Sequence, residues 1–173
     1  GSVFLLVADA TLFGSLLFGY AFLWTIAPGW PPPEWIAPSA IVVALAGVGV
    51  ALSIIGPFFA TRANAGGSNP AVGLALSLAG SAAIAAALVA MLMMAPSPTG
   101  HAYGATLLVL GGYGILHAIV VALMAAFLIA RVRAGYTSPR RRAEIAILPV
   151  WGAYGGGIAV VILLAAYLPV ALS

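Results

Sequence analysis

The stretch from Leu5 to Tyr20 reads LLVADATLFGSLLFGY, and it is apolar except for small hydroxyl residues, a tyrosine and one carboxylate, Asp9. The apolar run around it extends from Val3 to Ile26. A helix of about 20 such residues can cross the roughly 30 Å hydrocarbon core of a bilayer. The stretch therefore predicts a membrane-spanning helix that carries an acid within its apolar length.

The composition of the whole chain agrees with a membrane protein. Of its 173 residues, 64% are hydrophobic and only 5% are charged, whereas soluble domains carry roughly 25% charged residues. The net charge of +3 comes from six arginines, too few to indicate a nucleic-acid partner, and none is expected. The absence of cysteine excludes disulfides, thiolate metal sites and cysteine nucleophiles.

Five runs are long and apolar enough to span a bilayer. They are Val3–Ile26, Ala37–Thr61, Ala71–Ala95, Tyr103–Val132 and Glu144–Leu172. Segments rich in glycine, proline and asparagine separate them, as expected of turns. The sequence predicts an all-α polytopic membrane protein, with residues 1–173 forming one bundle of five transmembrane helices. No basic segment precedes the first run, so no cleavable signal peptide is expected. The missing initiator methionine leads us to expect a processed, tagged or excised segment.

The arginines predict the orientation in the membrane. Arg62 lies between the second and third runs, and the other five lie between the fourth and fifth: Arg131, Arg133, Arg140, Arg141 and Arg142. Both loops fall on the same side, which the positive-inside rule makes cytoplasmic. The N-terminus is therefore expected inside and the C-terminus outside. The basic loop is expected to face lipid headgroups, and Trp30 and Trp35 to lie at the outer interface.

Small residues within the runs predict close helix packing. Gly73, Ser77 and Ser81 recur every four positions, a spacing that lets a neighbouring helix approach closely. Gly112 in the fourth run is assigned the same role. Gly56-Pro57 predicts a kink near the end of the second run. These features favour a tightly packed bundle.

Asp9 is the sharpest candidate for function. It lies about 9 Å from the start of its run at helical rise, and a charge inside a membrane helix costs roughly 2.5–3.5 kcal/mol. It is either a structural acid, bonded to Thr11, Ser15 or a group on another span, or part of a proton- or lipid-linked site. Both readings stay open.

His117 lies near the middle of the fourth run, where a histidine either forms an interhelical hydrogen bond or takes part in a proton or ligand site. His101 is expected to be solvated in an outer loop. Two separated histidines do not supply the three or four ligands of a metal site, so neither a metal nor a cofactor is expected in this chain. No nucleophile with a base is evident, and no catalytic centre is predicted.

Several segments resemble subunit III of haem-copper cytochrome c oxidases. The first run, ADATLFGSLLFGYAFLW (8–24), places Asp9 where that family has a glutamate, and APGWPPP (27–33) matches its Trp-Pro-Pro loop. YGATLLVLGGYGILHAI (103–119) is similar to a segment ending in Gly-Phe-His-Gly-Leu-His, with His117 at the second histidine. VWGAYGGG (150–157) keeps Trp151 of the fifth segment but has glycine at its histidine and aspartate positions.

The resemblance implies a non-catalytic accessory subunit of a haem-copper terminal oxidase in a bacterial cytoplasmic membrane. Such a subunit packs against catalytic subunit I and subunit II, supports proton uptake and stability, and binds phospholipid, while haem and copper belong to the partner. The departures fit a domain fused behind subunit I. Two alternatives remain: a subunit III relative in a nitric oxide reductase complex, and a small proton-coupled transporter that uses Asp9 and His117.

Overall fold

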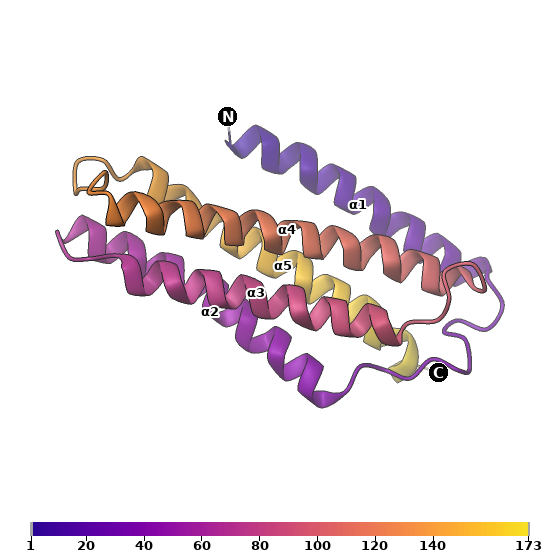
Figure 1. The fold of residues 1–173 in the computed structure, drawn as a ribbon. Helices are drawn as coiled ribbons and strands as arrows, with labels where there is room; N and C mark the ends of the chain where they lie inside the picture. Colours follow the sequence, from indigo (N-terminus) through magenta and orange to yellow (C-terminus); the bar gives the residue numbers. More distant parts are fainter. Residues whose placement is uncertain (1, 173) are drawn as a thin grey trace.

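The computed structural model describes residues 2–172, and this part of the chain consists of five long α-helices joined by loops, the longest of which connects α1 to α2 (Figure 1). The helices are α1 (Ser2–Ile26), α2 (Ala40–Ala65), α3 (Ala71–Met94), α4 (Ala102–Arg133) and α5 (Ala143–Leu172). All five are long and apolar enough to cross a membrane. The all-helical prediction is confirmed, and the five helices support a multi-pass membrane protein.

The predicted boundaries agree with the helices to within one residue at each end, except for the second run. That run was predicted from Ala37 to Thr61, but α2 starts at Ala40 and ends at Ala65. The later start follows from Pro38, because the residue before a proline avoids the helical conformation. At the other end the helix continues past Pro57 to Ala65, so the proline lies inside α2 and further from its end than predicted.

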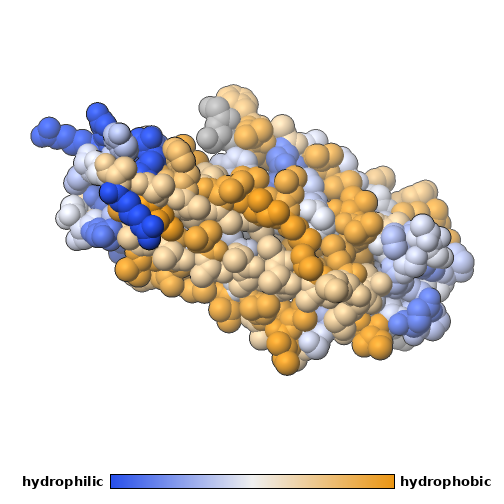
Figure 2. Space-filling view, viewed as in Figure 1, coloured by the Kyte–Doolittle hydropathy of each residue, from blue (hydrophilic) through white to orange (hydrophobic). Residues whose placement is uncertain are grey.

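The loops gather at the two ends of the bundle. At one end the Asn64 side chain donates a hydrogen bond from Nδ2 to the Ser138 carbonyl oxygen at 3.2 Å, which joins the last turn of α2 to the α4–α5 loop. At the other end His101 Nε2 lies 3.3 Å from the Pro28 carbonyl oxygen. Hydrophilic residues gather at both ends of the face in Figure 2, and hydrophobic surface lies between them. The end that holds the α2–α3 and α4–α5 loops therefore carries all six arginines, although Arg62 lies in the last turn of α2, and Arg131 and Arg133 in that of α4, instead of in loops.

Helices α2 and α3 meet backbone to backbone. A Cβ atom added to Gly73 would lie 2.5 Å from Ala60 N, and one added to Gly80 would lie 2.6 Å from Ser53 N. Neither position has room for any side chain. Ser77 and Ser81 are also buried on α3. Close packing of this kind is how apolar helices associate when burial from water contributes little.

The contact is reciprocal, because the two helices present nearly the same sequence to each other. Residues 49–56 read GVALSIIG and residues 73–80 read GLALSLAG. A Cβ on Gly49 would lie 2.8 Å from Gly80 O, and one on Gly80 would lie 2.7 Å from Gly49 O. Gly56 and Gly73 show the same exchange at 2.7 and 2.5 Å. The antiparallel pair thus forms a local two-fold interface of the self-complementary kind.

Gly112 does not have the predicted packing role. It is exposed, and a Cβ atom there would meet nothing within 4 Å. The buried glycines of this part of α4 are Gly111, which lies against Leu92, and Gly114, which lies against Leu88 and Ile162. Successive residues in a helix are rotated by about 100° around its axis. Gly112 therefore lies outside the face of α4 that packs against the other helices.

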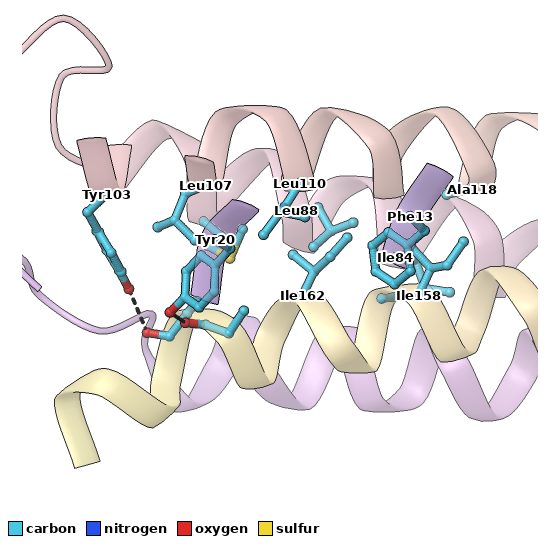
Figure 3. Close-up of a cluster of buried hydrophobic side chains, with 14 of the residues drawn as sticks. Phe13, Tyr20, Ile84, Leu88, Tyr103, Leu107, Leu110, Ala118, Ile158 and Ile162 are labelled. Atoms are coloured by element: carbon cyan, nitrogen blue, oxygen red, sulfur yellow. Dashed lines mark hydrogen bonds between the residues drawn. The ribbon is translucent and has the colours of Figure 1, made fainter. Parts of the chain in front are cut away.

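A proline in α5 leaves a backbone carbonyl oxygen available for a hydrogen bond from α1. Pro169 has no N–H, so the carbonyl oxygen of Ala165 lacks its usual helical donor. Tyr20 of α1 donates its hydroxyl to that oxygen at 2.6 Å. Tyr103 of α4 donates to the next carbonyl, that of Ala166, at 2.9 Å, and both bonds are drawn in Figure 3. Apolar side chains from α3, α4 and α5 fill the space beside them: Ile84, Leu88, Leu107, Leu110, Ile158 and Ile162.

The α2–α3 contact can be tested with a pair of matched substitutions. Gly73→Ala should lower the free energy of unfolding by about 1–3 kcal/mol, because the new methyl group forces two backbones apart. Gly112→Ala changes a glycine to the same residue in open space and should leave stability unchanged or slightly raised. Unfolding of both variants in detergent by increasing SDS gives the comparison. Equal stability of the two variants would contradict the close contact.

Candidate functional site

Asp9 lies in a polar cluster built from three helices. His117 of α4 places Nε2 2.9 Å from Asp9 Oδ2, and Tyr154 of α5 donates its hydroxyl to the same oxygen at 2.5 Å. Tyr113 of α4 donates its hydroxyl to the Asp9 backbone carbonyl at 3.1 Å. The acid is therefore held by groups from α4 and α5, far from it in sequence.

The local candidates for bonding Asp9 are engaged elsewhere. The Thr11 hydroxyl donates to the Val7 carbonyl at 2.9 Å, and the Ser15 hydroxyl donates to the Thr11 carbonyl at 2.9 Å. Both bonds stay within α1. Of the partners that the sequence left open for Asp9, the structure thus selects groups on other helices.

Helical spacing positions the cluster. Asp9 and Phe13 are four residues apart on α1, as are Tyr113 and His117 on α4, so each pair shares one face of its helix. The rings of Phe13 and Tyr113 stack with centroids 5.3 Å apart and planes 6° from parallel. This stacking places Asp9 beside His117. On α5, Gly155 lies beside the histidine, since a Cβ atom added there would be in ordinary van der Waals contact, 3.8 Å from the Cβ of His117.

The hydrogen bonds determine how many protons the Asp9–His117 pair holds. His117 Nδ1 lies 2.9 Å from the Tyr113 carbonyl oxygen, which can only accept, so Nδ1 carries a hydrogen. The contact between Nε2 and Oδ2 then needs one further proton, on either the imidazole or the carboxyl group. In both cases the pair is neutral overall. A shared proton of this kind lets an acid and a base lie among apolar helices without a net charge.

The cluster is closed on one side and open on the other. The His117 side chain is 6% exposed, whereas that of Asp9 is 22% exposed. Both interhelical bonds of the carboxyl group go to Oδ2. The partly exposed Asp9 carboxyl group is therefore a point at which the site can exchange a proton or accept a further hydrogen bond.

Neither histidine has a ring nitrogen free for iron or copper. Both nitrogens of His117 are bonded, to Asp9 and to the Tyr113 carbonyl. His101 accepts from Tyr103 N at 3.0 Å through Nδ1, and its Nε2 faces the Pro28 carbonyl. His101 thus caps α4, whereas solvation in a loop was predicted. In the described part of the chain, His, Asp and Glu side chains nowhere gather in a group of three or more that could hold a metal ion.

The two tryptophans predicted at the outer interface lie at the end of the bundle that holds the α1–α2 loop. The Trp30 ring packs edge-on against Tyr20 and Tyr103, with centroids 5.4 and 5.0 Å apart. Trp35 packs against Tyr103 at 5.6 Å and is only 6% exposed. Trp35 thus differs from the expected headgroup-facing position, because its ring is covered by the chain itself.

The five predicted interface arginines of the α4–α5 connection lie at the end of the bundle where Arg62 also lies. Arg133 and Arg140 to Arg142 are exposed, and Arg131 is half-buried. Arg131 Nε lies 2.7 Å from Glu144 Oε2. The arginines and the Asp9 cluster are separate sites, since no polar contact joins them in the described chain.

Sequence reasoning missed the two tyrosines of the cluster. Tyr113 could have been found, because it precedes the singled-out His117 by one helical turn. Tyr154 had a weaker signal: it stands among the small residues of WGAYGGG (151–157), where a single large polar ring has room to reach across the interface.

The chain matches no protein-family model and no curated protein sequence. Its function is therefore inferred from the site itself and from the resemblance in its helices.

The interhelical bonds of Asp9 predict an energetic coupling between α1 and α5. A double-mutant cycle of Asp9→Asn and Tyr154→Phe should give a coupling of about 0.5–1.7 kcal/mol, the range of hydrogen bonds between membrane helices. The coupling is obtained from the free energies of unfolding in detergent of the unsubstituted chain, the two single variants and the double variant.

Thr11→Val provides the matched control, because the Thr11 hydroxyl bonds only to its own helix. Its cycle with Tyr154→Phe should show no coupling. An uncoupled Asp9–Tyr154 pair, or equal values for both cycles, would contradict the cluster.

Proposed function

We propose that this chain is a non-catalytic accessory subunit of a haem-copper terminal oxidase, of the subunit III type. In this proposal its five helices cross a bacterial cytoplasmic membrane and pack against catalytic subunit I and subunit II. Its work is to stabilise the catalytic partner and to support proton uptake. Haem and copper are held by the partner.

One observation carries the proposal: Asp9 and His117 contact each other. Both were singled out from the sequence as polar residues within apolar runs, and each also matches a polar position of the subunit III family, in the first and fourth helices respectively. These helices are distant in the chain, and nothing in the spacing of either motif requires the two side chains to meet. Their contact at 2.9 Å supports the view that the two matches belong to one site.

The chemistry of the cluster supports an accessory role connected with protons. The pair shares one proton between Nε2 and Oδ2 and carries no net charge, and two tyrosine hydroxyls bond to the same aspartate. Such a group can release or accept a proton through the exposed Asp9 side while α4 and α5 keep its geometry. The arrangement offers no nucleophile activated by a base, and both histidines already use both ring nitrogens.

The proposed orientation places the N-terminus and both arginine loops in the cytoplasm, following the positive-inside rule. The chain has no cysteine, so single cysteines at positions 62 and 140 can be labelled without background. Both should react with a membrane-impermeant maleimide only after the cells are opened. A cysteine at position 34, in the α1–α2 loop, should react in intact cells. Labelling of positions 62 and 140 from opposite sides would contradict the proposal.

Co-purification tests the proposed function. The tagged chain, extracted from its native membranes in a mild detergent, should bring with it a haem-bearing partner that consumes oxygen with a cytochrome or quinol donor. Asp9→Asn should leave the haem content unchanged and at most slow turnover or shorten its lifetime, because the acid lies outside the redox centre.

The other outcomes of this experiment are equally definite. A haem-bearing partner that reduces nitric oxide in place of oxygen would assign the chain to the alternative reductase complex. A chain that runs alone in every mild detergent would overturn the accessory role. Loss of haem from the Asp9→Asn complex would show that the role of this residue is different.

A further inference from the structure

A pocket lined mainly by arginines lies at the connection between α4 and α5. It has a volume of about 340 Å³. The residues that line it are Arg131, Arg140, Arg141, Arg142, Ala143 and Glu144. Arg133 and Arg62 lie at the same end of the bundle but do not line this pocket. The pocket thus distinguishes four of the six arginines from the other two.

The charges of the pocket are unbalanced. Four arginines and one carboxylate residue, Glu144, line it, and this carboxylate is already paired with Arg131. The chain has only two other acids: Asp9 is bonded to His117, and Glu34 lies in the α1–α2 loop. In the described residues Arg140, Arg141 and Arg142 therefore have no anionic partner. Guanidinium groups match the geometry of phosphate oxygens and bind them through two parallel hydrogen bonds.

The Arg131 side chain, which lines one side of the pocket, is restricted in conformation by contacts within the chain. The Arg131 guanidinium lies 5.5 Å from the Phe127 ring centroid and 5.4 Å from that of Tyr136. Together with the contact to Glu144, these rings restrict the side chain. A restricted arginine loses less conformational freedom on binding an anion than a free one does.

The surface beside the pocket indicates where the anion comes from. Phe127 on α4 and Ile147 and Val150 on α5 are exposed apolar side chains one to two turns from the arginines. A headgroup phosphate in the pocket would leave its acyl chains along these side chains. A free phosphate ion would use the arginines but not the apolar surface.

We propose that this pocket binds the phosphate of one anionic phospholipid, with Arg140, Arg141 and Arg142 as its ligands and Arg131 as the fixed wall. The inference goes beyond the accessory function and does not depend on which partner the chain has. It assigns to the α4–α5 connection a discrete lipid site, in addition to the general attraction of basic loops to membranes.

Native mass spectrometry of the detergent-purified chain can count bound lipids. With phosphatidylglycerol as the probe, one lipid should bind more tightly than the rest, and phosphatidylcholine should not compete at equal concentration. The double variant Arg140→Gln/Arg141→Gln should weaken this first binding about tenfold or more. The control Arg62→Gln/Arg133→Gln removes the same charge at the same end, outside the pocket, and should change it less than about threefold.

The remaining outcomes overturn the proposal. Equal weakening by the two double variants would show a general charge effect without a site, and equal binding of both lipids would show that the anionic headgroup is not selected. Inorganic phosphate in excess should not displace phosphatidylglycerol; if it does, the pocket is a site for soluble anions. Helical circular dichroism should be unchanged in both variants, because the four substituted side chains are exposed.

Discussion

The fold depends on how closely α2 and α3 approach each other. In a chain whose helices are almost wholly apolar, burial of hydrophobic side chains does not by itself select one helix pairing over another, because a lipid tail offers the same environment. Direct contact between backbones does select one helix pairing, because such contact is possible only where glycines occupy the four facing positions. Helix α5 then joins this pair where Gly152 packs against the Ser53 carbonyl, which Pro57 leaves without its helical donor. The three helices form a compact base for the others.

Helix α1 is attached to this base in a different way. Of its described side chains, only Phe13 and Tyr20 are buried, and in Figure 1 its N-terminal part lies away from the other helices. It is held through α4 and by hydrogen bonds at two levels, from Tyr20 to α5 and between Asp9 and the groups of α4 and α5. The helix with the fewest packing contacts thus carries the polar cluster, and the cluster contributes to its position.

The arrangement separates two kinds of chemistry along the molecule. The Asp9 cluster holds a neutral proton-sharing pair within the apolar length of the helices, whereas the arginine pocket presents net positive charge at one end. The proton site is suited to work beside a catalytic neighbour, and the pocket is suited to a lipid. Both are compatible with the proposed accessory role.

Most of the fold could be predicted from the sequence, since the length and apolarity of a membrane helix are local properties that each segment displays on its own. The same holds for the arginine loops and for the glycine and serine stripe of α3. The matching α2 segment, GVALSIIG, was equally visible but was not recognised as its partner. The continuation of α2 past Thr61 to Ala65 was not predicted, because neighbouring helices decide how far a membrane helix that contains a proline extends.

Only the tertiary structure decided which polar groups meet. The sequence marked Asp9 and His117 as unusual, because a polar residue in an apolar run is conspicuous. It did not reveal that they bond to each other, nor that Tyr113 and Tyr154 complete the cluster, since the rotation of each helix about its axis follows from packing over its whole length. The same reason applies to Gly112 and Gly111: one residue of helical rotation separates an exposed glycine from a buried one, and the neighbouring helices determine which is which.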